Sequence, residues 1–486
     1  MSNEDELTLE IESEDFSCDG LRVRTFSGKE AIGHLFDYEL EVVGPHDSGA
    51  DPDAMLGAHV TLVLQRAEGR GGSWHGTRHL HGVVTEVDDL LAAHATLRVH
   101  RLRVRPRAHA LGLVEAQDIF MGLTVPQIIE QKLKLVGLEK GYELRLSGQY
   151  APREFVVQYA ETDLAFVSRL CEHLGISFFV EQREAGDTLV FTDHPAGFTE
   201  NPDAASLPFA PRGESRDVFA LSSRRRLIPA YYVVRDYNYR TPLLDLTSEH
   251  ELPAGYAGGV FEMGTHHKTP AEGKALAAIR ADERESKQLV YTGESASPTL
   301  AAGTRFELTD HPDLGNVRLL VVEVEHRAEV IVDGHSAQRP GYRSTFVAIP
   351  AERAYRPARV TPRPRISGVV TGIIDGGPAG NAAKYAQVDA EGRYMVRFSF
   401  DTAPPGERPA SRPVRMLQNH AGEGYGTHFP LKPGVEVAIA FVGGDPDRPM
   451  IVGAIPNPIK PSPVTNEDPG LHRVRTSTGI TVDMHE

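Results

Sequence analysis

The sequence has few of the features that stabilise secreted or membrane-embedded proteins. Its 486 residues include two cysteines, Cys18 and Cys171, which are too few for a disulfide framework and fit a reducing compartment. It contains no run of eighteen apolar residues, as a transmembrane helix would need. The first ten residues, MSNEDELTLE, lack the basic and apolar parts of a signal peptide. We therefore expect assembly in the cytoplasm, and export only by a route that does not use a signal peptide.

Basic side chains are also in the minority. Lysine and arginine number 51 against 67 aspartates and glutamates, so the net charge is −16. This balance argues against a general nucleic-acid-binding protein, which needs positive charge for the phosphate backbone. The negative charge is concentrated in residues 1–60, which hold 15 acidic and 3 basic side chains. A solvated face is the simplest interpretation, and an acidic end that orients assembly is the alternative.

Helical periodicity is rare in this sequence, and short strands dominate. Runs such as LTLEIE, FDYELEVVG and HVTLVLQRA alternate apolar and polar residues between turn-forming residues. Helices are predicted at residues 124–138 and 162–175, where a threonine precedes an apolar stripe, and at residues 269–286, where Pro270 is followed by several strong helix formers. The fold class is therefore mainly β with a few helices.

A stretch around the second predicted helix, residues 155–182, carries the side-chain types of a nucleophilic site. Cys171, however, falls on the apolar face of the helix, where a thiol behaves as a small hydrophobe. Ser168 and His173 are five positions apart, so their side chains diverge by about 140° and cannot form a nucleophile–base pair on one helix. The segment is predicted to pack, and no catalytic residue is assigned.

Two basic patterns are candidate binding sites. Arginines at 101, 103, 105 and 107 share one face of a strand, but no aromatic residues lie between them for base stacking. A solvated or subunit-facing strand is the favoured interpretation. The histidine pairs 79/81 and 266/267 lack the spacing of a zinc site. No metal site and no cofactor site are predicted.

The last third of the chain has the pattern of a small barrel. A proline-rich linker ends near residue 368, and about five short strands follow in residues 367–455, which suits an oligomer-binding (OB) fold. Gly422, Gly424 and Gly426 precede a strand instead of a helix, so they predict a tight loop and not a phosphate site. A nucleic-acid-binding OB protein stays as an alternative because Tyr385, Tyr394, Phe398 and Phe400 are available for stacking. Alternation assigns the last three of these aromatics, with Val396, to the inner face of the barrel.

The final residues predict a shared core. Ile480, Val482 and Met484 alternate along the last strand, and three apolar side chains are too few to bury alone. Further copies of the strand could supply a common core, so the final strand predicts self-association.

Several motifs, in order, resemble VgrG spike proteins of type VI secretion and related contractile injection systems. They are LRVRTFSGKEAIGHLFDYELEV, IFMGLTVPQIIEQKL, FVVQYAETDLAFVSRLCEHLGISFFVE, GTRFELTDHPDLGNVRLLVVEVEHRA, GRYMVRFSFD and PVRMLQNHAGEGYGTHFPLKPGVEVAIAFVGGDPDRPMIVGAI. The resemblance implies a phage-hub-like region of two barrel-like domains over 1–360, an OB-fold spike domain over 361–460, and a linker with the first strand of a trimeric β-helix needle over 461–486.

The same resemblance implies function and partners. It implies a non-enzymatic homotrimer that caps a hexameric, Hcp-like inner tube, contacts baseplate components, carries effectors, and meets the target membrane only on firing. A PAAR-like tip protein would cap a full needle, whereas here the sequence ends at Glu486. The hub face, including Glu10, Glu12, Glu14 and Asp15, is expected to contact the tube. A cell-wall hydrolase within the spike is the enzymatic alternative, but the roughly 26 residues after the barrel are too few for such a domain.

Overall fold

The computed structural model shows a mainly β chain that folds as two compact units. The first unit comprises Met1–Val114, Ile129–Gln149 and Asp163–Pro362, and the second comprises Glu115–Ile128, Tyr150–Thr162 and Arg363–Glu486. None of the helices in the described part of the chain has the length and apolar composition that a membrane crossing requires. The structure describes residues 7–45, 51–66, 74–90, 97–212, 217–330, 341–377, 380, 383–404 and 410–485.

The first unit is built on one long, mainly antiparallel sheet. Its N-terminal part runs in the order β1-β4-β5-β6-β3-β2. Strand alternation explains its burial: β1 buries Leu7, Leu9 and Ile11 and exposes the residues between them. The inward side chains of these strands form one hydrophobic core. The strands are β1 (Leu7–Glu12), β2 (Arg22–Ala31), β3 (Asp37–Pro45), β4 (His59–Arg66), β5 (Gly76–Leu90) and β6 (Leu97–Arg105).

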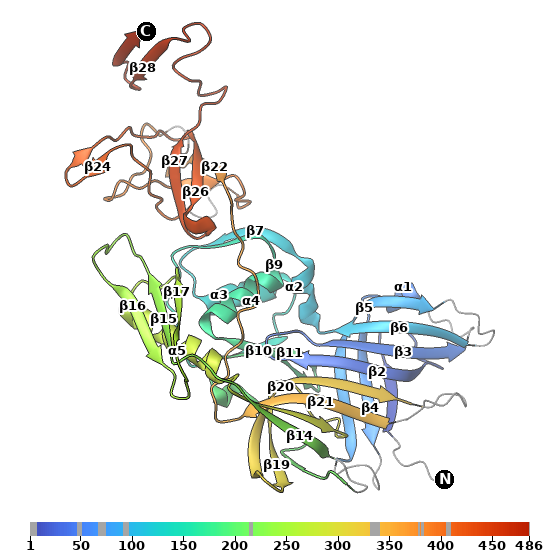
Figure 1. The fold of residues 1–486 in the computed structure, drawn as a ribbon. Coiled ribbons are helices and arrows are strands. Elements are labelled where there is room, and N and C mark those ends of the chain that lie inside the picture. The colour runs from blue at the N-terminus through green and yellow to red at the C-terminus, as the bar shows by residue number, and fades with distance from the viewer. Residues whose placement is uncertain are drawn as a thin grey trace. The chain divides into compact units, whose positions relative to one another are not determined.

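The same sheet continues around a second core. In Figure 1 the blue strand β2 lies beside the yellow β20, and the two are paired antiparallel. The order then runs β20-β21-β18-β14, while β19 pairs with β20, β12 and β13. Phe306, Val324 and Phe346 are central to this second core. The predicted pair of barrel-like parts thus corresponds to one sheet that surrounds two cores. These strands are β12 (Thr199–Glu200), β13 (Ser206–Pro208), β14 (Val218–Arg225), β18 (Leu289–Ser295), β19 (Thr304–His311), β20 (Gly315–Glu329) and β21 (Gly341–Pro350).

All three predicted helices are present. Thr124 and Gln127 exchange capping hydrogen bonds at the start of α3. Thr269 accepts a hydrogen bond from the backbone N–H of Glu272 at the start of α5, and Gly175, with φ +69°, ends α4. The α-helices are α1 (Pro52–Met55), α2 (Ala110–Leu113), α3 (Val125–Leu135), α4 (Asp163–Leu174) and α5 (Pro270–Glu285), and short 3₁₀ turns occur at Arg107–His109, Pro195–Gly197 and Val442–Gly444.

The strands on either side of α4 belong to different sheets. β9 (Val156–Thr162) pairs with β7 (Glu115–Phe120), whereas β10 (Ser177–Arg183) pairs with β11 (Gly186–Thr192), which also pairs with β8 (Tyr142–Arg145). The expected strand–helix–strand succession is present. It does not form a single sheet, because the chain passes from the second unit to the first between β9 and α4.

A smaller sheet completes the first unit. β15 (Tyr231–Asp236) lies between β16 (Leu246–Glu251) and β17 (Gly259–Met263), and α5 packs on this sheet. Tyr232 and Val234 of β15 share a core with Ala277 and Ala281 of α5. The opposite face of the sheet leaves Phe261 of β17 60% exposed.

The second unit contains the predicted barrel-like domain. Four strands form a sheet in the order β23-β22-β26-β27 around Tyr394, Val396 and Ile439. One of the five strands expected between residues 367 and 455, the segment 413–420, makes isolated bridges from Val414 and Met416 instead. It changes partner within three residues and starts at a proline, so no continuous ladder forms. The strands are β22 (Val369–Ile374), β23 (Val396–Phe398), β24 (Ala421–Gly422), β25 (Tyr425–Gly426), β26 (Glu436–Phe441), β27 (Pro449–Ala454), β28 (Leu471–Arg475) and β29 (Thr481–His485).

Candidate assembly surfaces

The C-terminal hairpin carries the residues predicted to form a shared core. β28 and β29 pair antiparallel, with Val474 opposite Val482 and His472 opposite Met484. Alternation places these side chains, with Ile480, on one face. Ile480, Val482 and Met484 are 68%, 55% and 57% exposed in the single chain. The hairpin therefore has an apolar face that its own chain leaves in solvent, and its burial by other copies stays a prediction.

The other face of this hairpin is polar. Arg473 and Asp483 lie directly opposite each other, and the guanidinium donates from Nε to Oδ1 at 2.8 Å and from Nη2 to Oδ2 at 3.0 Å. A two-point arginine–carboxylate pair of this kind fixes the strand register. The hairpin consequently presents two chemically different faces from only ten paired residues.

The arginine stripe of β6 is neutralised by neighbouring strands. Arg103 donates from Nε to Asp37 Oδ1 at 2.7 Å, and Arg105 donates from Nη1 to Glu86 Oε1 at 2.8 Å. Arg101 lies 3.5 Å from a glutamate oxygen of β3. The three arginines thus sit between acidic side chains of β3 and β5, which supports the interpretation as a solvated strand. The charges needed by a phosphate-binding stripe are already compensated within the sheet.

Arg107, the fourth arginine of the pattern, lies outside the strand. Its guanidinium donates from Nε to Asp187 Oδ1 at 2.7 Å, and its backbone N–H donates to Oδ2 at 3.0 Å. Asp187 is buried at the start of β11. Arg107 therefore connects β11 to the end of β6, and its guanidinium is engaged by Asp187 instead of being open to a ligand.

The acidic N-terminal end forms an exposed sheet edge. Glu10 and Glu12 project from β1, which is the terminal strand of the long sheet, and Glu14 is exposed just after it. Asp15 is engaged locally, because it accepts the backbone N–H of His59 at 2.7 Å. That hydrogen bond and the contact with the His59 ring lower the pKa of Asp15. This edge therefore carries exposed negative charge, and its contact with the tube stays a prediction.

The helix that gathers Asp, Ser, Cys and His is a packing element. Cys171 is 1% exposed, and burial raises the pKa of its thiol, which disfavours the reactive thiolate. Ser168 is also buried. His173 is occupied elsewhere: its carbonyl accepts from Arg280 Nη1 at 3.0 Å, and its Nδ1 lies 3.2 Å from Nη2 of the same guanidinium. These contacts agree with the predicted structural role of α4.

The histidine pairs are held by ordinary polar contacts. The rings of His79 and His81 stack at 6.1 Å on β5, and His81 Nδ1 is 2.9 Å from Thr61 Oγ1. His267 is buried, and its Nε2 donates to the Leu246 carbonyl at 2.7 Å. The histidine pairs therefore contribute to packing and hydrogen bonding within the first unit.

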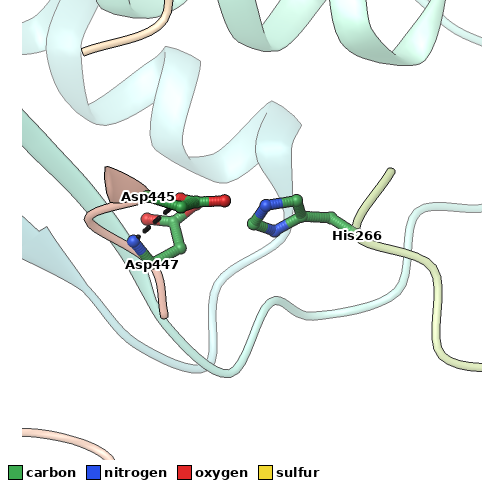
Figure 2. A group of neighbouring side chains, drawn as sticks. All are labelled: His266, Asp445 and Asp447. Atoms are coloured by element: carbon green, nitrogen blue, oxygen red, sulfur yellow. Dashed lines mark hydrogen bonds between the residues drawn. The ribbon is translucent and has the colours of Figure 1, made fainter. Parts of the chain in front are cut away.

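Two aspartates shape the turn before β27. The backbone N–H of Asp447 donates to Asp445 Oδ1 at 3.1 Å, as Figure 2 shows. Asp447 Oδ1 also accepts the backbone N–H of Val157 at 2.7 Å, which ties β9 to this turn within the second unit. His266, drawn in the same figure, belongs to the first unit, where its backbone N–H donates to Asp236.

The aromatic residues of the barrel mostly form its core. Tyr394 and Phe398 are 0% and 2% exposed, and Phe400 packs partly buried against the same core. Tyr385 is exposed at 63%, and Lys432 lies 4.2 Å from its ring centroid. The inward-facing prediction is thus confirmed, and the core aromatics are not available as a stacking platform for nucleic-acid bases.

A buried charged network was missed by the sequence analysis. Glu30 Oε1 accepts from Tyr38 Oη at 2.8 Å and lies 3.0 Å from His326 Nε2. Glu30 Oε2 accepts the backbone N–H of Ala302 at 3.1 Å, and Arg78 Nη2 is 3.9 Å from Oε1. The network ties β2, β3, β5 and β20 together where the two cores meet. The alternation of the strand could have indicated that Glu30 is buried. Every second side chain of a strand lies on the same face, and Glu30 is two and four positions after Gly28 and the buried Phe26.

Sequence comparison identifies two successive domains in the chain. The phage tail baseplate hub (GPD) family matches residues 29–331, and the type VI secretion system/phage-baseplate injector OB domain matches residues 385–455. The type VI secretion system spike protein VgrG5 of Pseudomonas aeruginosa is 32% identical over 478 residues. The actin cross-linking toxin VgrG1 of Vibrio cholerae is 27% identical over 503 residues. The matches cover 93% and 99% of this chain but only 58% and 44% of those two proteins.

Solved structures share the fold. The E. coli c3393 protein, a component of the type VI secretion system with similarity to T4 bacteriophage tail proteins gp27 and gp5, gives a TM-score of 0.66 at 24% identity, covering 92% of this chain and 100% of that chain. A chain of the lidded Francisella PdpA-VgrG complex gives a TM-score of 0.63 at 10% identity, covering 100% of this chain and 76% of that chain. Since the hub match alone covers more than half of the sequence, the chain belongs to the phage tail baseplate hub (GPD) family.

Proposed function

We propose that the chain is the trimeric hub and spike of a contractile injection machine of the type VI secretion class. The carrying observation is the order of its parts: a hub domain, an injector OB domain and an exposed apolar hairpin follow one another in one chain. Spike proteins of type VI secretion systems are similar to it over most of its length. The division at residues 1–360, 361–460 and 461–486 belongs to this proposal.

The hub would solve a symmetry problem at the end of the inner tube. The first unit wraps one sheet around two cores, so three chains bring six such bodies together. Six bodies around a threefold axis suit a hexameric, Hcp-like tube. The exposed acidic edge at β1 is a source of charge complementarity for this contact, which would set the rate and orientation of docking more than its strength.

The spike would work mechanically and without catalysis. Sheath contraction would supply the energy, and short-looped β domains would transmit the force. We assign no enzymatic step to residues 7–485; the toxin named among the relatives is more than twice as long as the region it shares with this chain. Baseplate components, a PAAR-like tip protein and effectors are the proposed partners. Assembly would take place in the cytoplasm, with export and membrane contact on firing.

The mass of the purified protein tests the proposal. Light scattering of a trimer should give a mass of three times 53.2 kDa, about 160 kDa. Replacing Ile480, Val482 and Met484 by serine should shift the protein toward monomer. The control is Leu243→Ser, which removes a side chain that is 99% exposed in the first unit and should leave the mass unchanged. A monomer of the unaltered chain at micromolar concentration, with or without tube protein, would contradict the trimer.

A further inference from the structure

One segment of the barrel unit is structured yet stands in solvent. Residues 419–430, here called the arm, are exposed without exception. The arm contains β24 and β25 and extends away from the sheet β23-β22-β26-β27 (Figure 1). His428 ties the arm to the barrel, because its Nε2 lies 3.0 Å from Tyr394 Oη. The arm is thus anchored at its base and left uncovered along its length.

The arm has a defined shape. Ala421 pairs with Gly426 and Gly422 pairs with Tyr425. The Tyr425 ring covers Gly422, where an added Cβ would lie 2.2 Å from Tyr425 Cζ. The same ring lies 5.2 Å from the His420 ring. A two-stranded hairpin alone is marginal in water, so a stable arm of this form requires a surface to cover it.

The chemistry of the arm favours an apolar cover. Tyr425 and Phe429 are 63% and 61% exposed, and Leu417, just before the arm, is 57% exposed. The arm contains one carboxylate, that of Glu423, and no lysine or arginine. Aromatic side chains of this kind are typical anchors of protein interfaces. A partner surface of low charge is therefore the best fit.

The same barrel carries such a surface. On the outer face of its sheet, Val369 and Ile373 are 59% and 48% exposed. Val369 is paired with Ala440 and Thr371 with Ala438, so this part of the outward rows is apolar or small, while Ile373 is paired with Glu436 at the end of β26. An antiparallel sheet that faces water usually has polar residues there. This face, defined by Val369, Thr371, Ile373, Ala438 and Ala440, is called the β22–β26 face.

We propose that the arm of one copy docks on the β22–β26 face of a neighbouring copy. One chain carries both an uncovered arm and an uncovered face, so each copy would give one arm and receive one. A head-to-tail contact of this kind closes into a ring when the rotation allows it. The apolar hairpin β28–β29 follows the same barrel and would be covered by further copies in the proposed trimer, which favours this chain over an unrelated partner. This inference rests on the proposed trimer, and it names the arm and the β22–β26 face as the surfaces through which neighbouring copies would touch.

Directed cross-linking tests the contact. Thr427→Cys places a thiol on the arm and Thr371→Cys places one on the face; each is made in a separately tagged chain that also carries Cys18→Ser. Mixed and oxidised, the two chains should form a disulfide-linked pair that contains both tags. A chain with Thr247→Cys, an exposed position on β16, replaces the arm variant as control and should give no such pair with Thr371→Cys.

The outcomes separate this contact from the trimer itself. A trimer by light scattering without the arm–face disulfide would overturn the arm docking and leave the proposed function standing. A monomer would overturn both. As a second measurement, Tyr425→Ser with Phe429→Ser should raise the concentration at which the trimer dissociates by about tenfold or more, since interface aromatics carry much of the binding energy. Phe261→Ser in the first unit is the matched control, and equal effects of the two changes would contradict the proposal.

Discussion

Glu30→Gln tests the buried network between the two cores of the first unit. Burial raises the pKa of Glu30, but the hydrogen bond and charge of His326, the charge of Arg78 and the hydrogen bond from Tyr38 lower it more, to about 2 from an ordinary 4.5. A difference of that size corresponds to roughly 3 kcal/mol of folding free energy at neutral pH. Glutamine keeps the shape and loses the charge, so we expect a loss of about 3 kcal/mol at pH 7.

The pH dependence follows from the sign of the shift. The folded pKa lies below the unfolded one, so this stabilisation is present above pH 4.5 and is lost as the pH falls toward 2. The stability difference between the unaltered chain and Glu30→Gln should therefore be present at pH 5 and shrink below pH 4.5.

Urea unfolding followed by tryptophan fluorescence measures this difference. Trp74 is the single tryptophan and is 7% exposed in the first unit, so it reports on the unit that contains the network. Glu325→Gln is the control, because its exposed carboxylate lies 3.7 Å from Lys29 and should contribute under about 0.5 kcal/mol. A loss below 1 kcal/mol for Glu30→Gln, or a difference that persists unchanged at pH 3, would refute the assigned role.

Three further predictions concern other parts of the first unit. Cys171→Ser should lower stability by roughly 1–3 kcal/mol by burying a hydroxyl and should leave trimer mass unchanged; a change in mass with the fold intact would contradict the packing role of α4. His100 is 0% exposed, and its ring has no hydrogen bond among the described residues. Its pKa is lowered mainly by burial. Protonation of His100 therefore opposes folding as the pH falls below about 6.5. His100→Leu should therefore stabilise the protein by about 1 kcal/mol, and more at pH 5 than at pH 8, in the same urea assay; equal stability at both pH values would exclude the effect. Reversing Glu10 and Glu12 to lysine should slow tube nucleation at low salt, with the trimer intact; kinetics unchanged at low and high salt would remove β1 from the docking surface.

Local signals in the sequence accounted for much of the fold. Capping residues and apolar stripes located α3 and α4, and a proline followed by strong helix formers located α5, because these signals act within a few positions of the chain. Alternation located β1 to β6 and assigned Tyr394 and Phe398 to the barrel core. It also placed Ile480, Val482 and Met484 on one face of the last strand, and their burial in a shared core stays a prediction.

These local signals could not predict which strands pair when they are far apart in the sequence. Nothing local indicates that β2 pairs with β20, nearly 300 residues later, or that β7 and β9 join the core of the second unit. The Glu30 network depends on that pairing, since His326 reaches the carboxylate only through β20. The arginine stripe shows the same limit: its position in a strand was evident, while its partners Asp37 and Glu86 became identifiable only with the sheet order.

Cryo-electron microscopy of the full chain mixed with its hexameric tube protein tests the central claim most directly. The account predicts a threefold particle at one end of each tube, with six similar β bodies against the tube ring and a single spike built from three barrels on the far side. Bare tube ends together with single copies of the chain would contradict the claim that this protein is a trimeric hub and spike.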